Sequence, residues 1–144
     1  MRARRTRTGL RIKGARGHPV ARAAILRFAK WLRREYDFPM RVPVYLFPSD
    51  QIITRHGDKA VASFFAPFNR NEEPYIRIAT GDYPKLKKER GRDNALAEFL
   101  HSFAHELVHY QQWIAGGEKA MAERGVARRA ESIVRRYALT TNHP

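Results

Sequence analysis

Residues 94–114 read NALAEFLHSFAHELVHYQQWI. The apolar side chains in this stretch recur at helical spacing, which predicts one long amphipathic helix. On a helical wheel they form a single stripe of Leu96, Phe99, Leu100, Phe103, Leu107, Tyr110 and Ile114. The opposite side, where a surface helix would carry Lys, Arg and Glu, instead carries His101, His105, His109 and Gln112. Residues 115–117, Ala-Gly-Gly, then end the helix, as glycine commonly does.

The pattern H-E-x-x-H occupies residues 105–109 of this helix. Histidines four residues apart lie about one turn apart on the same face, so His105 and His109 can bind one zinc ion. Glu106 follows the first histidine and is turned toward the open coordination position. There it can act as a general base toward a water molecule that the metal activates. The alternative is a pair of exposed histidines on an amphipathic helix, but the imidazole-lined face favours zinc.

A catalytic zinc site needs a third protein ligand, and with no cysteine in the chain it must be His, Asp or Glu. The candidates beyond residue 109 are Glu118, Glu123, Glu131 and His143. Glu118 follows the glycine turn too closely to fold back over the metal. Glu131 lies at the border of the apolar stripe of a predicted last helix, residues 118–139, packed antiparallel on the first. We therefore expect Glu131 to be the third ligand, with Glu123 as the second candidate. The alternative for Glu131 is a surface ion pair with Arg128 or Arg135 at helical spacing.

The remainder of the chain predicts a single α+β domain over residues 18–144. A helix should begin near Pro19, which suits a first helical position, and end near residue 37. Residues 42–47, 60–65 and 75–80 have the composition of three short strands, and the last two are expected to form a hairpin. Residues 84–93 are expected to be a charged linker between the last strand and the histidine-bearing helix.

The charge of the chain suggests a polyanionic partner. Lys and Arg number 28 against 14 Asp and Glu, which gives a formal net charge of +14. Residues 1–17 hold seven of these basic residues and no acid. We expect them to form a disordered arm that binds nucleic acid weakly and without sequence specificity. The alternative is that the excess of arginine only keeps the protein in solution.

The expected cellular compartment is inferred from three features that the sequence lacks. The absence of cysteine fits a reducing compartment, and no apolar run approaches the length of a membrane span. No apolar stretch follows the basic start, as a signal peptide would require. We expect a cytoplasmic protein without a membrane span.

The segment HELVH at residues 105–109, followed by ARRAESIV at residues 127–134, resembles the gluzincin branch of the zincin metallopeptidases. The likeness is closest to minimal gluzincins, in which the third zinc ligand is a glutamate on the helix after the active-site helix. The resemblance implies a small zincin-like fold and a zinc peptidase that acts on peptides or proteins. The metzincin branch is not supported, because Gln112 and Ala115 occupy the positions of its Gly and third His. A Spartan-like protease, which degrades proteins attached to DNA, is also similar in HELVHYQQW and in the basic arm.

The resemblance further implies a substrate-binding edge strand beside the active-site helix. By this likeness residues 75–80 would pair with an extended substrate, with Tyr75 or Arg77 facing the cleft. Zincins also use a residue that stabilises the transition state, for which His101, Tyr110 and Tyr137 are candidates. A different class of function is a nucleic-acid or partner-binding module that keeps a structural zinc ion and has no activity. We also consider that His143, in the tail beyond residue 139, could occupy the open metal position and block catalysis.

Overall fold

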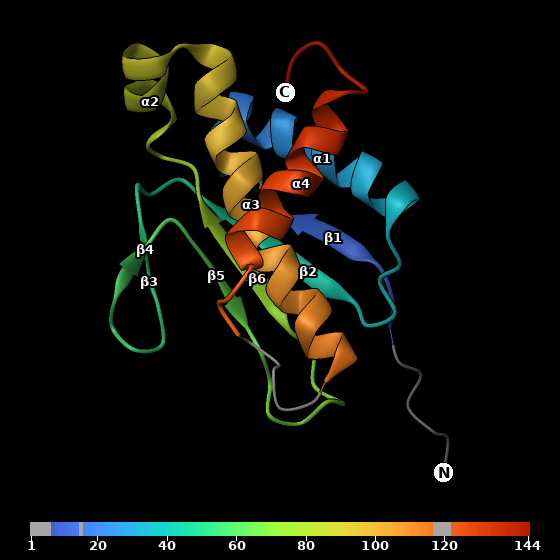
Figure 1. The fold of residues 1–144 in the computed structure, drawn as a ribbon. Coiled ribbons are helices and arrows are strands. Elements are labelled where there is room, and N and C mark those ends of the chain that lie inside the picture. Colours follow the sequence, from blue (N-terminus) through green and yellow to red (C-terminus); the bar gives the residue numbers. More distant parts are fainter. Residues whose placement is uncertain (1–6, 15, 117–121) are drawn as a thin grey trace.

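Four strands form the main sheet of the computed structural model, which describes residues 7–14, 16–116 and 122–144 (Figure 1). The spatial order is β1 (Leu10–Lys13), β2 (Val42–Phe47), β6 (Tyr75–Ala79) and β5 (Ala62–Phe65). Both β1 and β6 run parallel to β2, whereas β5 is antiparallel to β6. A separate hairpin pairs β3 (Ile52–Ile53) with β4 (Lys59–Ala60). The three predicted strand regions are confirmed, and so is the antiparallel pairing of the last two.

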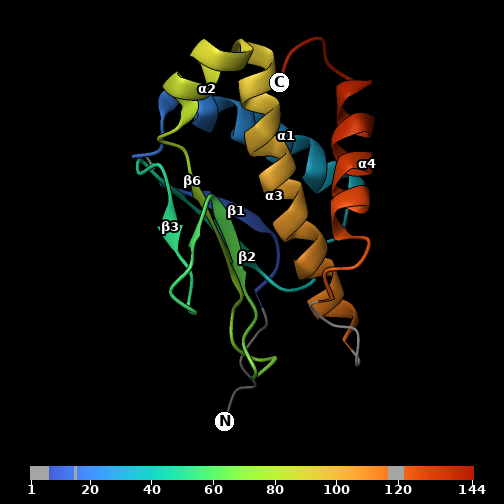
Figure 2. The ribbon, with the colours of Figure 1, turned by 60° about the vertical axis from the view of Figure 1, so that its left-hand side comes forward.

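Helices cover one face of this sheet. α1 (Pro19–Glu35) and α3 (Arg92–Ala115) pack against the strands, and α2 (Tyr83–Arg90) and α4 (Val126–Ala138) pack against α3. Figure 2 shows α1, α3 and α4 on one side of the sheet and the β3–β4 hairpin on the other. The start of α1 is as predicted, with Pro19 in the first turn and the His18 Nδ1 atom accepting a hydrogen bond from the Val20 amide. None of the described helices combines the length and the apolar character needed to cross a bilayer. The mixed α+β class is thus confirmed.

The core lies between the sheet and the helices. The strands contribute Leu10, Val42, Val44, Leu46, Ile76 and Ile78, and the stripe of α3 packs against them. Tyr110 is part of this core, where its ring stacks on Phe38 and its hydroxyl donates to the Met40 carbonyl. The indole nitrogen of Trp113 donates to the Pro67 carbonyl (3.1 Å) and joins the end of α3 to the segment after β5. These contacts fix α3 beside β5.

The expectation of a disordered arm over residues 1–17 is wrong for β1. Leu10 is completely buried, and residues 10–13 pair in parallel register with residues 42–45. The alternation of Leu10 and Ile12 with Arg11 and Lys13 is a strand pattern, but four residues among many arginines give a weak signal. Residues 1–6 and 15 of the expected arm lie outside the described residues.

Two other element boundaries differ from the expectation. The segment predicted as a charged linker forms α2, which buries Tyr83 against the remainder of the domain. The last helix begins at Val126 rather than near residue 118. Residues 117–121, with Glu118, lie outside the described residues, and residues 122–125 are not helical.

The position of the edge strand is also corrected. The strand expected at the edge, β6, lies inside the sheet, because it pairs with β2 on one side and β5 on the other. Among the described residues β5 forms the sheet edge next to α3. The sequence could not show this order, since strand order depends on packing between distant segments.

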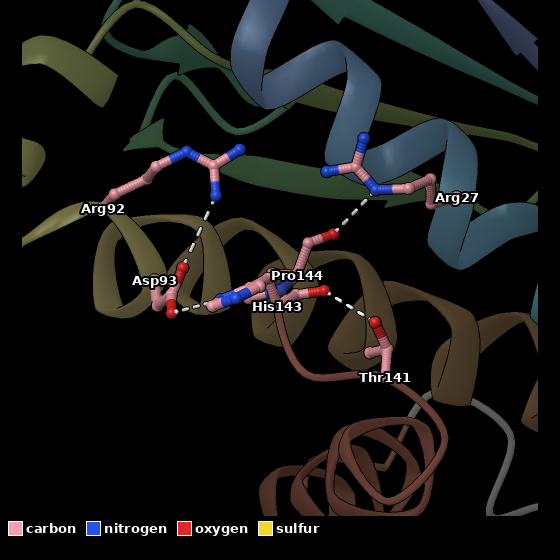
Figure 3. A network of polar contacts seen from close by, with 6 residues as sticks. All are labelled: Arg27, Arg92, Asp93, Thr141, His143 and Pro144. Atoms are coloured by element: carbon pink, nitrogen blue, oxygen red, sulfur yellow. Dashed lines mark hydrogen bonds and ion pairs between the residues drawn. The ribbon is translucent and has the colours of Figure 1, made fainter.

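The C-terminal tail lies beside the first turn of α3, where His143 meets Asp93 (Figure 3). The His143 ring lies 3.0 Å from a carboxylate oxygen of Asp93, and the Arg27 Nε atom donates to the Pro144 carbonyl (3.1 Å). Asp93 is 12 residues before His105 in the same helix, a separation of roughly 18 Å at 1.5 Å per residue. The tail therefore does not bring His143 to the histidine pair, contrary to the inhibitory role considered above.

Candidate metal centre

Two imidazoles and one carboxylate converge where α3 passes the sheet edge. His105 and His109 lie one turn apart on α3, with ring centroids 5.1 Å apart. The carboxylate of Glu123 bridges them, at 3.4 Å from His105 Nε2 and 2.9 Å from His109 Nε2. The three ligand atoms lie within 4.8 Å of one another. This is the only such cluster among the residues that the structure describes.

The third carboxylate differs from the one expected. Glu131 is not in the cluster, and its carboxylate instead pairs with Arg135 (2.9 Å), the surface alternative considered from the sequence. The reason is the orientation of α4, which buries Val126, Ala130, Ile133, Val134 and Tyr137 and leaves Glu131 exposed on the other side. Glu123, the second candidate, lies in the segment that precedes α4.

The chain directs Glu123 toward α3 by two local features. Gly125 has a φ of 80°, in the left-handed region that favours glycine, and the chain turns sharply there before α4 begins. The Gln112 side-chain amide donates to the Ala122 carbonyl (2.8 Å), so residue 122 is tied to α3. The Glu123 side chain is 73% exposed and approaches the histidines from the open side.

Gln112 also sets the orientation of His109. Its amide nitrogen must donate to the Ala122 carbonyl, so its oxygen faces His109 Nδ1 at 2.9 Å. An amide oxygen accepts only, and Nδ1 therefore carries the proton. Nε2 is then the ring atom directed at Glu123 (2.9 Å), the position from which it could bind a metal. The sequence placed Gln112 on the histidine face without giving it a role, and its spacing of three residues from His109 was the available signal.

Glu106 lies beside the cluster and is nearly enclosed, with 8% of its surface exposed. Burial, together with the negative charge of Glu123, raises the pKa of Glu106 from 4.5 to about 7. A carboxylate with a raised pKa holds a proton more firmly once it has accepted one, which suits a general base near neutral pH.

An open cleft of about 450 Å³ leads to these residues. Its lining comes from α3, from both faces of the edge strand β5, and from the turn of the β3–β4 hairpin. Tyr75 and Arg77, the expected substrate-binding residues, both line the cleft. Arg55 and His56 of the hairpin turn also line it, and the sequence analysis did not single them out.

The expected transition-state stabilisers lie elsewhere. His101 is exposed and lines a different hollow with Arg90 and Glu98. Tyr137 is a core residue that packs on Phe28 and Trp31 at 4.9 and 5.4 Å between ring centroids, and burial raises its pKa. Tyr110, as described above, is also in the core. None of the three lines the cleft at the metal cluster.

The donor set suits a borderline metal ion. Imidazole nitrogen and carboxylate oxygen are common ligands of zinc, and two histidines with one glutamate match the composition of catalytic zinc sites. Gln112 faces His109 Nδ1 and leaves Nε2 directed at Glu123, as ligation through Nε2 requires. The three residues could therefore hold a metal ion.

Comparisons with protein-family models, with curated proteins and with solved structures give no match. The interpretation of the centre thus depends on the residues themselves.

Proposed function

We propose that this chain is a zinc-dependent peptidase of the zincin type, in which His105, His109 and Glu123 hold the metal and Glu106 is the general base. The proposal is carried by one observation: two histidines and a carboxylate converge at a cleft beside a nearly buried glutamate. Three protein ligands leave room for water and substrate, whereas a structural zinc site is usually closed by four.

The roles of the residues follow from their positions. Zinc bound here would supply Lewis acidity toward a water molecule and a substrate carbonyl. Glu106 accepts a proton from the attacking water and returns it to the leaving amine, and its enclosure keeps bulk water from competing. Gln112 holds His109 in the metal-binding tautomer. Glu123 completes the ligand set from outside α3, a departure from the gluzincin pattern, in which the third ligand is on a helix.

The substrate in this proposal is an extended peptide. Among the described residues β5 pairs only with β6, so its other edge presents unpaired backbone groups beside the metal cluster. A peptide added there as a strand would place its backbone along the cleft. Tyr75 and Arg77 would contact its side chains from the neighbouring strand.

The test compares variants that separate metal binding from chemistry. Glu106→Gln should retain about one zinc ion per chain and lose cleavage of unfolded casein by at least about 100-fold, because only the base is removed. Glu123→Ala should lose zinc, whereas Glu131→Ala is a matched control that should keep it. Metal analysis and casein hydrolysis give the two readouts. Equal cleavage by wild type and Glu106→Gln would reject the mechanism, and zinc loss in Glu131→Ala alone would return the third ligand to α4.

A further inference from the structure

On the face of the main sheet that points away from α3, called the outer face below, every charged side chain of the strands is basic. The β3–β4 hairpin packs on this face beside β6, where Arg77 donates to the Ile53 carbonyl (2.9 Å) (Figure 2). Backbone register places Lys13 opposite Tyr45 and Tyr45 opposite Arg77, in one row across β1, β2 and β6. Arg11 is also exposed and has the same orientation as Lys13, because side chains alternate along a strand and Leu10 is buried. The sequences of the four strands contain no Asp or Glu.

Aromatic rings form a continuous series on the same face. Tyr45 of β2 is 39% exposed, and its ring centroid lies 5.9 Å from that of Tyr75 on β6. Tyr75 in turn stacks on Phe65 of β5, with 4.9 Å between centroids and 26° between planes. The guanidinium of Arg55 lies over Phe65 at 4.9 Å. Neighbouring rings support one another, and the exposed Tyr45 presents a surface to solvent at the end of the series.

This combination selects one kind of partner. In double-stranded DNA the base faces are stacked on one another, so exposed protein rings cannot stack on them. An acidic protein would be bound by the basic charges alone and would not require the aromatic rings. Single-stranded nucleic acid offers both phosphates and unstacked bases, and proteins bind it with basic surfaces that carry stacking aromatic residues. We propose that the outer face binds single-stranded nucleic acid, with Tyr45 stacking on a base and Arg11 and Lys13 contacting phosphates.

The proposed surface is distinct from the metal centre and does not depend on peptidase activity. The two surfaces share Arg55, Phe65, Tyr75 and Arg77, which also line the cleft, whereas Arg11, Lys13 and Tyr45 do not. A single-stranded nucleic acid bound on the outer face would thus end close to the edge of β5. Tyr45 does not line the cleft and is the residue of choice for a test.

The experiment measures binding of fluorescein-labelled oligo-dT and oligo-rU, each about 20 nucleotides long and thus longer than one binding footprint. A duplex of equal length is the comparison, and the full-length chain is used. Oligo-dT, oligo-rU or both should bind more tightly than the duplex. Tyr45→Leu should weaken this binding by about fivefold or more, as expected for loss of one stacked base. Tyr45→Phe keeps the ring and should remain within about twofold of wild type.

A charge-matched pair of double variants tests the phosphate contacts. Arg11→Ala with Lys13→Ala should reduce the slope of log affinity against log salt by about 1.4, since each lost contact with a single strand contributes about 0.7. Arg128→Ala with Arg135→Ala removes the same charge from exposed positions on α4 and should leave the slope nearly unchanged. Equal binding of single strands and duplex would overturn the proposal. Equal affinity of Tyr45→Leu and Tyr45→Phe would also overturn it. Binding through the charges of the basic N-terminal residues alone would not depend on an aromatic ring at position 45.

Discussion

Gln112 connects three parts of the candidate centre through one amide group. It accepts from His109, donates to Ala122, and thereby holds the segment that carries Glu123. Gln112→Ala should lower zinc affinity by about 10- to 100-fold, as is typical for loss of a partner that orients a metal-binding histidine. Competition with a chromophoric chelator gives the affinity. Gln111→Ala is the matched control. Among the described residues the Gln111 side chain hydrogen-bonds to Arg129 of α4 and not to the cluster, so this variant should bind zinc like wild type.

The raised pKa of Glu106 predicts how pH affects the stability of the metal-free protein. Its pKa is about 7 when folded against 4.5 when unfolded, so the folded state binds the proton more tightly. The resulting stability is present below pH 4.5 and is lost as pH rises toward 7. The free energy of unfolding of wild type should therefore fall relative to that of Glu106→Gln between pH 4.5 and 8, by at most about 3 kcal/mol at 1.36 kcal/mol per pH unit.

Urea unfolding of both proteins in the presence of a chelator measures this difference. Other titrating groups are shared by the two proteins and largely cancel. If the difference in stability between wild type and Glu106→Gln stays constant over this pH range, the pKa of Glu106 is not raised in the folded protein.

At the scale of single residues, the sequence was sufficient to place His105 and His109 together in a group that could hold a metal ion. The spacing of residues on one helix fixes which side chains share a face, so local geometry determines that part of the centre. The choice between Glu123 and Glu131 could not be made in this way. It depends on where α4 begins and how it is rotated against α3, and Ile133 and Val134 determine that rotation by their burial.

At the scale of elements, β1 shows how a short strand can be essential to the core. Leu10 has no exposed surface and packs in the main cluster, although it is surrounded in sequence by arginines. Leu10→Ala should lower the free energy of unfolding by about 2–5 kcal/mol, the usual cost of removing a large side chain from a core. Lys13→Ala in the same strand is exposed and should change it by less than about 0.5 kcal/mol. Denaturant titration measures both free energies of unfolding. If residues 10–13 were a dispensable arm, both substitutions would change the free energy of unfolding only slightly.

The helix α2 was missed for a related reason. Its sequence YPKLKKER has no apolar stripe, and helical periodicity is the main signal by which a helix is predicted. The Lys, Glu and Arg residues have good intrinsic helix propensity, and Pro84 suits the first turn. Tyr83 then anchors the helix to α3, with its ring centroid 6.5 Å from that of Phe99. Helix propensity and one buried contact are enough to form α2, but neither produces a periodic pattern of apolar residues in the sequence.

At the scale of the whole molecule, the sequence predicted the class and most of the elements but not their arrangement. The parallel pairs of β1 and β6 with β2 bring together segments far apart in the chain. No local pattern encodes which strand ends at the edge, because that depends on how α1 and α3 divide the sheet face between them. The consequence for the site is that β5, rather than β6, forms the sheet edge beside the metal cluster, while both strands line the cleft.

The short length of β5 also bears on how this protein behaves at high concentration. An open strand edge can pair with the same edge of another copy, and such contacts are a common start of aggregation. Here the strand has four residues and Pro67 follows it closely, so a second copy finds too few backbone partners to form a lasting sheet. In the proposed function, a peptide would also contact the metal and the cleft, so it would not need a long ladder of backbone hydrogen bonds with β5. Four residues would thus suffice for the proposed peptide but are too few for a stable sheet between two copies of the chain.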